Sequence, residues 1–346
     1  MIKNKKKYVF IGPVNLAEMP IGGAIVKNQF LYSYLKKNKN IVFLVDTYNW
    51  KFNIPVFIKM LYALFFLRNR EFVISLNTVS AYKLSYILKV FLIKDIKYFV
   101  IGDTVRSKLI DNEFNLSVYK IYKGIYTESR ATKEYLINRG LINVYHLPNF
   151  KKTNVFNRKL KKFPKLNDKI KFVFLSRIIK EKGVELIIEA VEKINNIKEK
   201  NQFSVTFFGP IPKSYTNIFV SKIENIDNIS YKGFIDLNRT DSYNILASHH
   251  VMIFPTFWHG EGFPGIFIDA FISGLPVIAS DWNINNEIIT NEKNGLLIRE
   301  NNIEELIDSM IFFIDNPDKI QEFGINSFLD ADKFDVDFLL DKIFIK

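Results

Sequence analysis

The chain has 346 residues, of which 48% are hydrophobic and 24% charged, with a net charge of +12 and no cysteine. This length is too great for one ordinary core and predicts two domains, and the composition excludes an intrinsically disordered chain. The lack of cysteine excludes a disulfide scaffold, thiolate metal ligands and a cysteine nucleophile.

The positive charge is concentrated in the first half of the chain. Residues 1–170 contain 31 Lys and Arg against 10 Asp and Glu, a net charge of +21, whereas residues 171–346 contain 17 against 26, a net charge of −9. This asymmetry indicates two domains with different partners. The basic half could bind nucleic acid, anionic lipid or a phosphorylated substrate.

No targeting or membrane-spanning segment is expected from the sequence. The apolar stretch that follows the basic N-terminus is shorter than a secretory signal requires. The longest apolar run, 54–67, is interrupted by Lys59 and is shorter than the ~20 residues that span a bilayer. We therefore expect a cytoplasmic protein.

In the first half, short apolar runs alternate with amphipathic stretches. The runs predict β-strands at 8–11, 41–45, 72–76, 97–101 and 121–126. The stretches between them predict helices, for example at 24–36 and 129–138. A basic, aperiodic segment at 150–168, which contains Pro164, is interpreted as a linker.

The second half repeats this alternation. Its predicted strands are 171–175, 204–208, 229–231, 251–254 and 276–279, and helical patterns follow at 183–194, 240–247, 264–273 and 303–314. Continuous apolar strands separated by helices are typical of parallel sheets that are covered on both faces. The predicted fold is α/β, with two doubly wound Rossmann-like domains, 1–165 and 166–330, that face a central cleft. A final helix, 331–346, could pack back on the first domain.

The segment 251–280 combines a buried strand, a glycine-rich loop and a helix. Pro255 ends the strand, and Pro264 stands near the first helical position, where proline is favoured. Exposed amides and the helix dipole at such a place favour an anion such as a diphosphate. Between Gly262 and Ser280 the only charged residue is Asp269. A carboxylate among apolar neighbours must reach a cleft, a cation or hydroxyl donors, because burying it without partners costs several kcal/mol.

The residues Glu261-Gly262-Phe263-Pro264-Gly265, followed by Asp269 and by Gly274-Leu275-Pro276, resemble the donor-site signature of the family-4, GT-B-fold retaining glycosyltransferases of the bacterial surface-polysaccharide type. In that family a first glutamate contacts the transferred sugar and a second holds the ribose of the nucleotide. The resemblance gives Glu261 the sugar role and Asp269 the ribose role. Asp269 departs from the usual glutamate, since its carboxylate is one methylene shorter.

Other segments extend the resemblance. Arg177 and Lys182 stand where the family has an arginine and a lysine that bind the donor diphosphate and stabilise the leaving group. Phe234 stands beside the position of the nucleotide base, and Gly22-Gly23 resembles a glycine-rich loop that approaches the donor phosphates. The donor-binding residues implied by the resemblance are Gly22, Gly23, Arg177, Lys182, Phe234, Glu261, Gly262, Phe263, Pro264, Gly265 and Asp269.

Two further residues are candidates for the acceptor side. Asp103 follows a predicted strand of the first domain, and His259 adjoins Glu261. No pattern of metal ligands is present in the sequence, so we expect no metal cofactor.

The resemblance implies an enzyme that moves a hexose or N-acetylhexosamine from a nucleotide sugar, UDP-linked by expectation, to a saccharide or polyprenyl-diphosphate-linked acceptor with retention. The catalytic residues would be Arg177, Lys182 and Glu261. The basic amphipathic segments 54–70 and 82–97 predict contact with an anionic membrane surface, at the inner face of the cell membrane.

Two other classes of function stay open. One is a sugar-nucleotide 2-epimerase of the same architecture, which would need catalytic acids and histidines, and this chain has only four histidines. The other is a basic, non-enzymatic nucleic-acid-binding protein, for which the sequence offers no recognition motif. We therefore expect no nucleic-acid partner.

Overall fold

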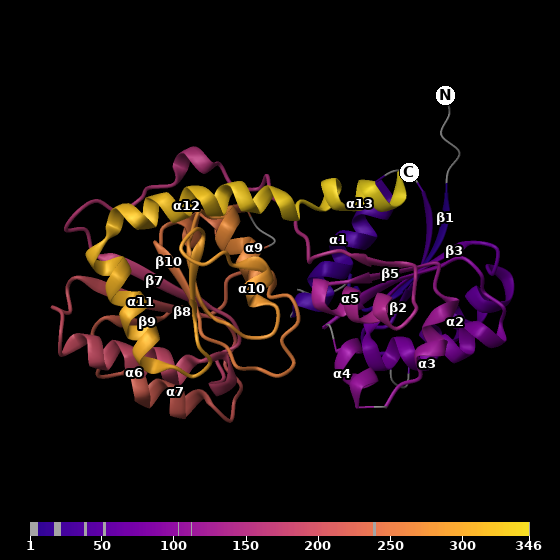
Figure 1. Cartoon of the computed structure of the whole chain (residues 1–346), viewed down its shortest axis with the longest axis horizontal. Coiled ribbons are helices and arrows are strands. Elements are labelled where there is room, and N and C mark those ends of the chain that lie inside the picture. Colours follow the sequence, from indigo (N-terminus) through magenta and orange to yellow (C-terminus); the bar gives the residue numbers. More distant parts are fainter. Residues whose placement is uncertain are drawn as a thin grey trace. The chain divides into compact units, whose positions relative to one another are not determined.

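The computed structural model describes residues 6–16, 22–37, 40–50, 53–102, 104–111, 113–237 and 240–345. The chain forms two compact units, Met1–Lys151 with Val336–Lys346, and Lys152–Asp335 (Figure 1). The boundary between the units therefore lies near the start of the predicted linker 150–168, and residues 152–165 belong to the second unit. The physical reason is that Phe156 is buried in the core of that unit and Phe163 packs against it.

The first unit contains a six-stranded sheet in the order β2-β1-β3-β4-β5-β6, and every neighbouring pair is parallel. Its strands are β1 (Lys7–Gly12), β2 (Ile41–Asp46), β3 (Glu71–Asn77), β4 (Ile96–Ile101), β5 (Gly124–Thr127) and β6 (Val144–His146). The apolar runs form the strands because both faces of the sheet are covered. Along β1, Tyr8 and Phe10 enter one core cluster while Val9 and Ile11 enter another.

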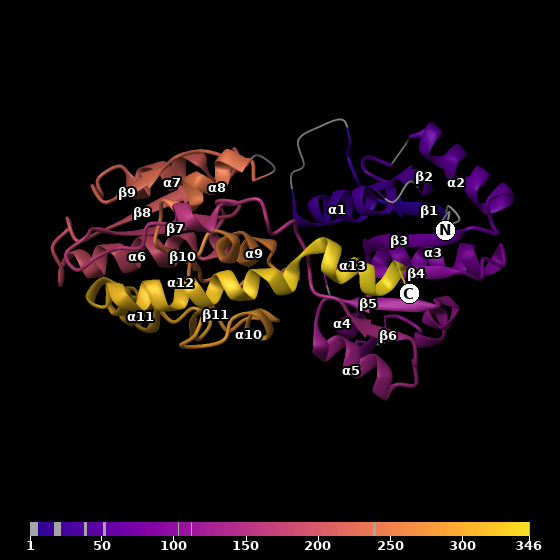
Figure 2. The same cartoon turned by 90° about the horizontal axis from the view of Figure 1, so that it is seen from above.

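In the described part of the first unit, six α-helices cover these faces. They are α1 (Gly23–Lys37), α2 (Ile54–Phe66), α3 (Thr78–Val90), α4 (Val105–Ile110), α5 (Arg130–Asn138) and α13 (Val336–Phe344). The last helix, α13, packs beside α1 (Figure 2), and Tyr34 donates a hydrogen bond of 2.6 Å to Asp341. The C-terminal segment thus belongs to the first unit. Among the described residues, no helix combines the length and the apolar character needed to cross a bilayer.

One predicted strand of this unit is wrong in its first part. The prediction placed a strand at 121–126, but Leu116–Ile121 is a 3-10 helix and β5 begins at Gly124. The apolar character of this stretch has another origin: Tyr119 and Tyr122 are buried side chains of the core beneath α3. The short strand β6 was not predicted, because three residues give too little alternation to detect.

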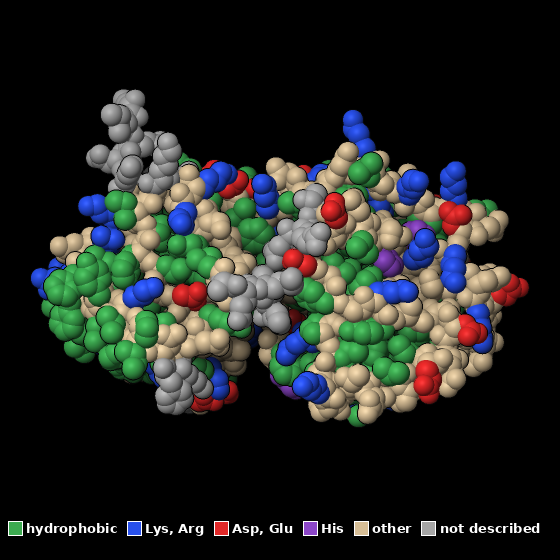
Figure 3. Space-filling model, turned by 180° about the vertical axis from the view of Figure 1, so that it is seen from behind, with side chains coloured by type: hydrophobic (Ala, Val, Ile, Leu, Met, Phe, Trp, Pro, Cys, Tyr) green, Lys and Arg blue, Asp and Glu red, His purple; other side chains and the backbone are tan. Residues whose placement is uncertain are grey.

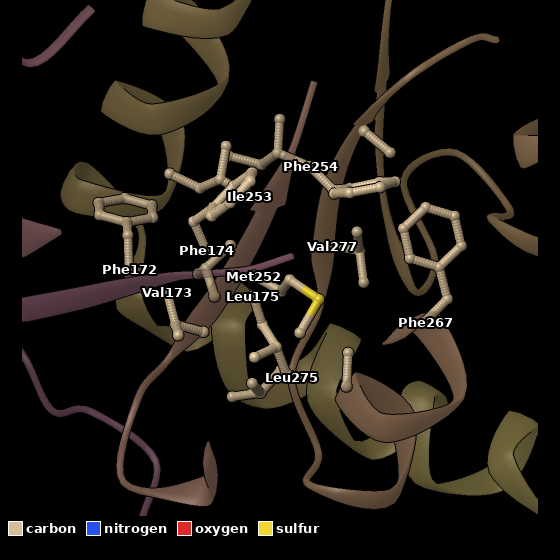
Figure 4. Packing of buried hydrophobic residues seen from close by; sticks show 14 of the residues in the cluster. Phe172, Val173, Phe174, Leu175, Met252, Ile253, Phe254, Phe267, Leu275 and Val277 are labelled. Carbon is tan, nitrogen blue, oxygen red and sulfur yellow. The ribbon is translucent and has the colours of Figure 1, made fainter. Parts of the chain in front are cut away.

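The second unit repeats the architecture with the sheet order β12-β11-β10-β7-β8-β9, again parallel throughout. Its strands are β7 (Ile170–Leu175), β8 (Phe203–Phe208), β9 (Ile229–Tyr231), β10 (Val251–Phe254), β11 (Val277–Ser280) and β12 (Gly295–Ile298). Figure 4 shows the side chains of β7 and β10 packed with Phe267 and Leu275 in the core. The rings of Phe254 and Phe267 meet edge to face, with centroids 5.5 Å apart.

The helices of the second unit follow its strands. They are α6 (Val184–Asn195), α7 (Thr216–Ile223), α8 (Thr240–Ala247), α9 (Gly265–Ile272), α10 (Asn285–Ile288), α11 (Ile303–Asp315) and α12 (Pro317–Ala331). The chain runs outward in one direction from β7 through β8 to β9, and in the other from β10 through β11 to β12. The order therefore reverses between β7 and β10, and ligands of open α/β sheets bind beyond the carboxyl ends of the strands at such a point.

Candidate active site

Two loops leave the carboxyl ends of the neighbouring central strands β7 and β10. The first contains Arg177 and ends in the 3-10 turn Lys180–Lys182, and the second runs from residue 255 to the start of α9. The amide of Phe257 donates a hydrogen bond of 2.9 Å to the carbonyl oxygen of Glu181, and the hydroxyl of Thr256 donates to the same oxygen at 3.3 Å. The loops are therefore fixed to each other.

Gly183 allows this close approach. It adopts φ of +81°, and a Cβ at this position would lie 2.3 Å from the carbonyl oxygen of Pro255. Only glycine fits both the left-handed backbone and the contact. Gly183, which follows the predicted diphosphate-binding Lys182, thus has a packing role in the site.

Lys182 and Glu261 form an ion pair where the two loops meet. The Nζ of Lys182 donates to Oε2 of Glu261, and the two side chains are only 6% and 12% exposed. Burial lowers the pKa of Lys182, the charge and hydrogen bond of Glu261 oppose that shift, and the nearby charge of Arg177 adds to it. The Thr256 hydroxyl also lies 3.3 Å from Oε2 of Glu261, so its single proton is shared between this oxygen and the carbonyl oxygen of Glu181. The structure therefore brings the predicted sugar-contact acid and a predicted diphosphate cation together.

Arg177 lies over an aromatic side chain of the second loop. Its guanidinium carbon is 5.2 Å from the ring centroid of Trp258, and the residue is exposed. The carbonyl oxygen of Trp258 accepts hydrogen bonds from the amide of Glu261 at 3.0 Å and from the indole of Trp282 at 2.9 Å. Sequence reasoning missed Trp258, although it stands three residues before Glu261. A solvent-accessible cation beside the buried pair is suited to an anionic ligand.

The start of α9 adds backbone donors to the same edge of the sheet. Pro264 is the residue before the helix, and no side chain caps the first turn. The amides at this end are suited to an anion. Phe263 has its ring in the core against Phe334, with centroids 5.5 Å apart. Its backbone, and not its side chain, is therefore the part suited to contact a bound nucleotide sugar.

Asp269 is buried in the second turn of α9. Its side chain is 1% exposed, and its Oδ1 accepts a hydrogen bond of 2.8 Å from the hydroxyl of Tyr243 on α8. Burial and the charge of Asp269 raise the pKa of the Tyr243 phenol. The protein itself thus supplies one hydroxyl donor to this carboxylate. Sequence reasoning did not find Tyr243, because nothing local links the two helices.

The other predicted residues are more dispersed. Phe234 is 50% exposed in the loop after β9, where the carbonyl oxygen of Gly233 accepts from the amide of Gly209. His259 is exposed, with its ring 5.2 Å from that of Trp282. Gly22 and Gly23 lie in the first unit at the start of α1, and Asp103 lies outside the described residues. No group of three or more potential metal ligands occurs within the described ranges.

Comparison with known proteins identifies the family. The profile described as "Glycosyl transferases group 1" matches residues 155–329, half of the chain and nearly all of the second unit. The chain belongs to this family. The matched segment contains both loops of the site, so the ion pair and Arg177 lie within the group 1 glycosyl transferase domain.

Two curated relatives and one solved structure place this glycosyl transferase domain among known proteins. An uncharacterized glycosyltransferase of Methanocaldococcus jannaschii is 23% identical over 64% of this chain and 57% of its own length. The UDP-Gal:alpha-D-GlcNAc-diphosphoundecaprenol alpha-1,3-galactosyltransferase of Escherichia coli is 31% identical over 29% of this chain and 28% of its own length. The chain therefore spans little more than half of the first relative and under a third of the second.

The solved structure is that of Anabaena HepE in complex with UDP. It is similar to 97% of this chain and 98% of its own, with a TM-score of 0.70 and 16% sequence identity. This likeness shows a shared fold, the two-unit GT-B architecture, and covers both units of the group 1 chain.

Proposed function

We propose that this chain is a glycosyltransferase that moves a hexose or N-acetylhexosamine from a nucleotide sugar to an acceptor hydroxyl with retention of configuration. The observation that carries the proposal is the buried ion pair of Lys182 and Glu261, with Arg177 beside it, at the point where the strand order of the sheet reverses. Buried charged groups at such a position are typical of a functional site.

The two cations would act on the leaving group. In the proposed reaction the bond between the anomeric carbon and the diphosphate oxygen breaks, and its electron pair stays on the diphosphate. The acceptor oxygen forms the new bond on the same face of the sugar, and its proton passes to the departing diphosphate. Arg177 and Lys182 would stabilise the negative charge that develops there. A diphosphate beside Lys182 would also offset the burial that lowers its pKa.

Glu261 would orient the transferred sugar. A carboxylate accepts hydrogen bonds from hydroxyl groups, and Lys182 and Thr256 hold this one in place. Asp269 would serve the ribose, sharing its carboxylate with Tyr243. We propose that these groups act without a metal ion, because two cations are already present for the leaving group.

The relatives suggest the class of donor and acceptor. The name of the Escherichia coli relative contains a UDP sugar and a diphosphoundecaprenol-linked acceptor, and the Anabaena structure contains UDP. We propose a UDP-linked donor bound by the second unit. The acceptor, a saccharide or a polyprenyl-diphosphate-linked sugar of cell-envelope glycan synthesis, would bind the first unit. The reaction would take place in the cytoplasm, at the inner face of the cell membrane.

A thermal-shift panel tests the donor assignment. The wild-type protein is mixed with UDP-, GDP-, ADP- and CMP-sugars, and the same panel is repeated on Arg177→Ala. Lys180→Ala is the matched control, since its side chain belongs to the same segment and is 67% exposed. We expect UDP-sugars to raise Tm, Arg177→Ala to weaken binding at least ~10-fold as for a lost charge-assisted contact, and the control to bind normally. No stabilisation by any nucleotide sugar would contradict the proposal.

A further inference from the structure

The outward face of α2 is apolar although it is exposed. Of the 13 residues of this helix only Ala63 and Leu64 are buried. The exposed fractions are 70% for Ile54, 58% for Ile58 and 59% for Phe65. These three positions share one helix face, because they follow each other at intervals of four and seven residues.

Such a face is unusual for a helix on the surface of a sheet. In the same chain, the exposed positions of α6 include Glu189 and Glu192, the normal pattern of a solvated helix. The only charged residue of α2 is Lys59. Water therefore contacts a continuous apolar stripe on α2, which marks an interaction site rather than a solvated surface.

The apolar surface continues onto the end of α3. The ring of Phe65 meets that of Phe91 with centroids 4.9 Å apart, and the flanking Val90 and Leu92 are 78% and 75% exposed. Figure 3 shows hydrophobic side chains gathered over this part of the first unit, with Lys and Arg among them. We call this surface, formed by α2 and residues 90–92, the α2 face.

The charges around the α2 face are mostly positive. Residues 53–94 contain six Lys and Arg and a single acid, Glu71. Glu71 is already paired with Lys97, whereas Lys59, Arg68, Lys83 and Lys89 are exposed. An apolar stripe bordered by cations fits a surface that is apolar inside and anionic at its boundary.

We propose that the α2 face lies on an anionic lipid bilayer, with Ile54, Ile58 and Phe65 in the acyl boundary and the surrounding lysines at the headgroups. This inference names the contact surface for the proposed membrane location and does not rest on sugar transfer. Charge complementarity favours lipid over a second copy of the chain, because pairing two such faces would bring their like charges together.

Vesicle flotation tests the apolar part of this inference. The full chain is mixed with vesicles of phosphatidylcholine alone or with one third phosphatidylglycerol. We expect flotation with the anionic vesicles only, and at least ~10-fold weaker partitioning for Ile58→Glu and Phe65→Glu, since each places a charge where the bilayer begins. Ile142→Glu is the matched control, because Ile142 is 87% exposed on the same unit outside the α2 face. Equal flotation of all four proteins would overturn the proposal.

A second arm tests the charges and separates the other outcomes. Lys59→Glu with Lys89→Glu should weaken anionic-vesicle binding more than Lys200→Glu, an exposed lysine of the second unit. Light scattering gives the oligomeric state: a wild-type dimer that Ile58→Glu converts to a monomer, without flotation, would assign the face to a second copy. Circular dichroism and UDP-sugar thermal shifts should be unchanged in the variants. Normal sugar-nucleotide binding without flotation would remove the lipid proposal and leave the proposed function intact.

Discussion

Asp269 is a buried acid whose carboxylate is held by a neighbouring helix. The pattern predicts a carboxylate that reaches a cleft, a cation or hydroxyl donors, and the structure shows one such donor, the phenol of Tyr243 at 2.8 Å. The phenol donates its one proton to Oδ1 of Asp269 and so fixes the position of that oxygen. Tyr243 therefore both stabilises the buried acid and orients it.

Removal of that phenol gives the first prediction. Tyr243→Phe should lower the free energy of unfolding of the second unit by about 1–3 kcal/mol, because the buried carboxylate of Asp269 loses the hydrogen bond from this phenol. Urea denaturation measures the free energy of unfolding, and hydrogen exchange in peptides of α8 and α9 shows whether the loss of stability lies in the second unit. Tyr145→Phe, 49% exposed in the first unit, is the control. Unchanged stability together with weaker nucleotide binding would instead make Tyr243 a direct ligand contact.

A buried lysine outside the site gives a pH-dependent prediction. The Nζ of Lys161 donates to the carbonyl oxygens of Ala247 at 3.1 Å and His249 at 2.7 Å, and burial lowers its pKa to about 7. The unfolded chain has the ordinary, higher pKa, so between about pH 7 and 10 it binds more protons than the folded chain does. Stability from this residue therefore rises with pH across that window.

Lys161→Met removes the titrating group. The wild-type protein should gain stability relative to Lys161→Met as pH rises from 7 to 10, with a slope of at most ~1.4 kcal/mol per pH unit. Chemical denaturation of both proteins at half-unit intervals of pH measures the difference. Parallel pH profiles for the two proteins would contradict the assignment.

At the scale of elements, sequence pattern predicts the strands that are long and buried on both faces. The runs at 171–175 and 251–254 correspond to β7 and β10 almost residue for residue. The reason is that a central strand of a parallel sheet is covered on both faces, so its residues form a continuous apolar run that the sequence shows clearly. The strands β6 and β12 are short and only partly buried, so their pattern is weak. The contact of the two site loops depends on packing between segments ~75 residues apart, which a local pattern cannot reveal.

The turn at Gly183 tests how the two loops are joined. Gly183→Ala should destabilise the second unit by more than Gly233→Ala, since both glycines have positive φ but a Cβ at Gly233 meets nothing within 4 Å. In both variants we expect the left-handed backbone conformation of a non-glycine residue to lower the free energy of unfolding by about 1–2 kcal/mol. At Gly183 the contact of the new Cβ with Pro255 should lower it further. Equal effects on the unfolding midpoint would show that the approach of the loops is not tight.

At the scale of the whole molecule, the domain assignment depends on contacts between distant parts of the chain. The sequence predicts two α/β domains and a returning C-terminal helix, but its basic segment at 150–168 does not reveal that Phe156 is a core residue of the second unit. Likewise the apolar positions of α13 indicate an amphipathic helix, but they do not show which part of the chain the helix packs against. The structure shows that the helix packs on the first unit, where Leu340 and Phe344 belong to the same core cluster as Tyr8 and Leu31.

The packing of the C-terminal helix α13 on the first unit gives a further prediction. Leu340→Ala should destabilise the first unit by about 2–5 kcal/mol, the usual cost of a cavity at a fully buried leucine. Phe338→Ala, on the same helix but 53% exposed, should have a much smaller effect. Hydrogen exchange of peptides from β1 and α1 reports on the first unit alone. Loss of protection in the second unit only would contradict the placement of α13.

The proposed function requires that the pair of Glu261 and Lys182 belongs to a site of sugar transfer. The most direct test measures nucleoside diphosphate release from the sugar nucleotide that stabilises the protein, with and without a saccharide or polyprenyl-diphosphate-linked acceptor. We predict acceptor-dependent release by the wild type, a kcat at least ~100-fold lower for Glu261→Gln, and normal rates for Glu189→Gln, an exposed acid of α6. A new sugar nucleotide formed without diphosphate release, or unchanged turnover by Glu261→Gln, would contradict the account.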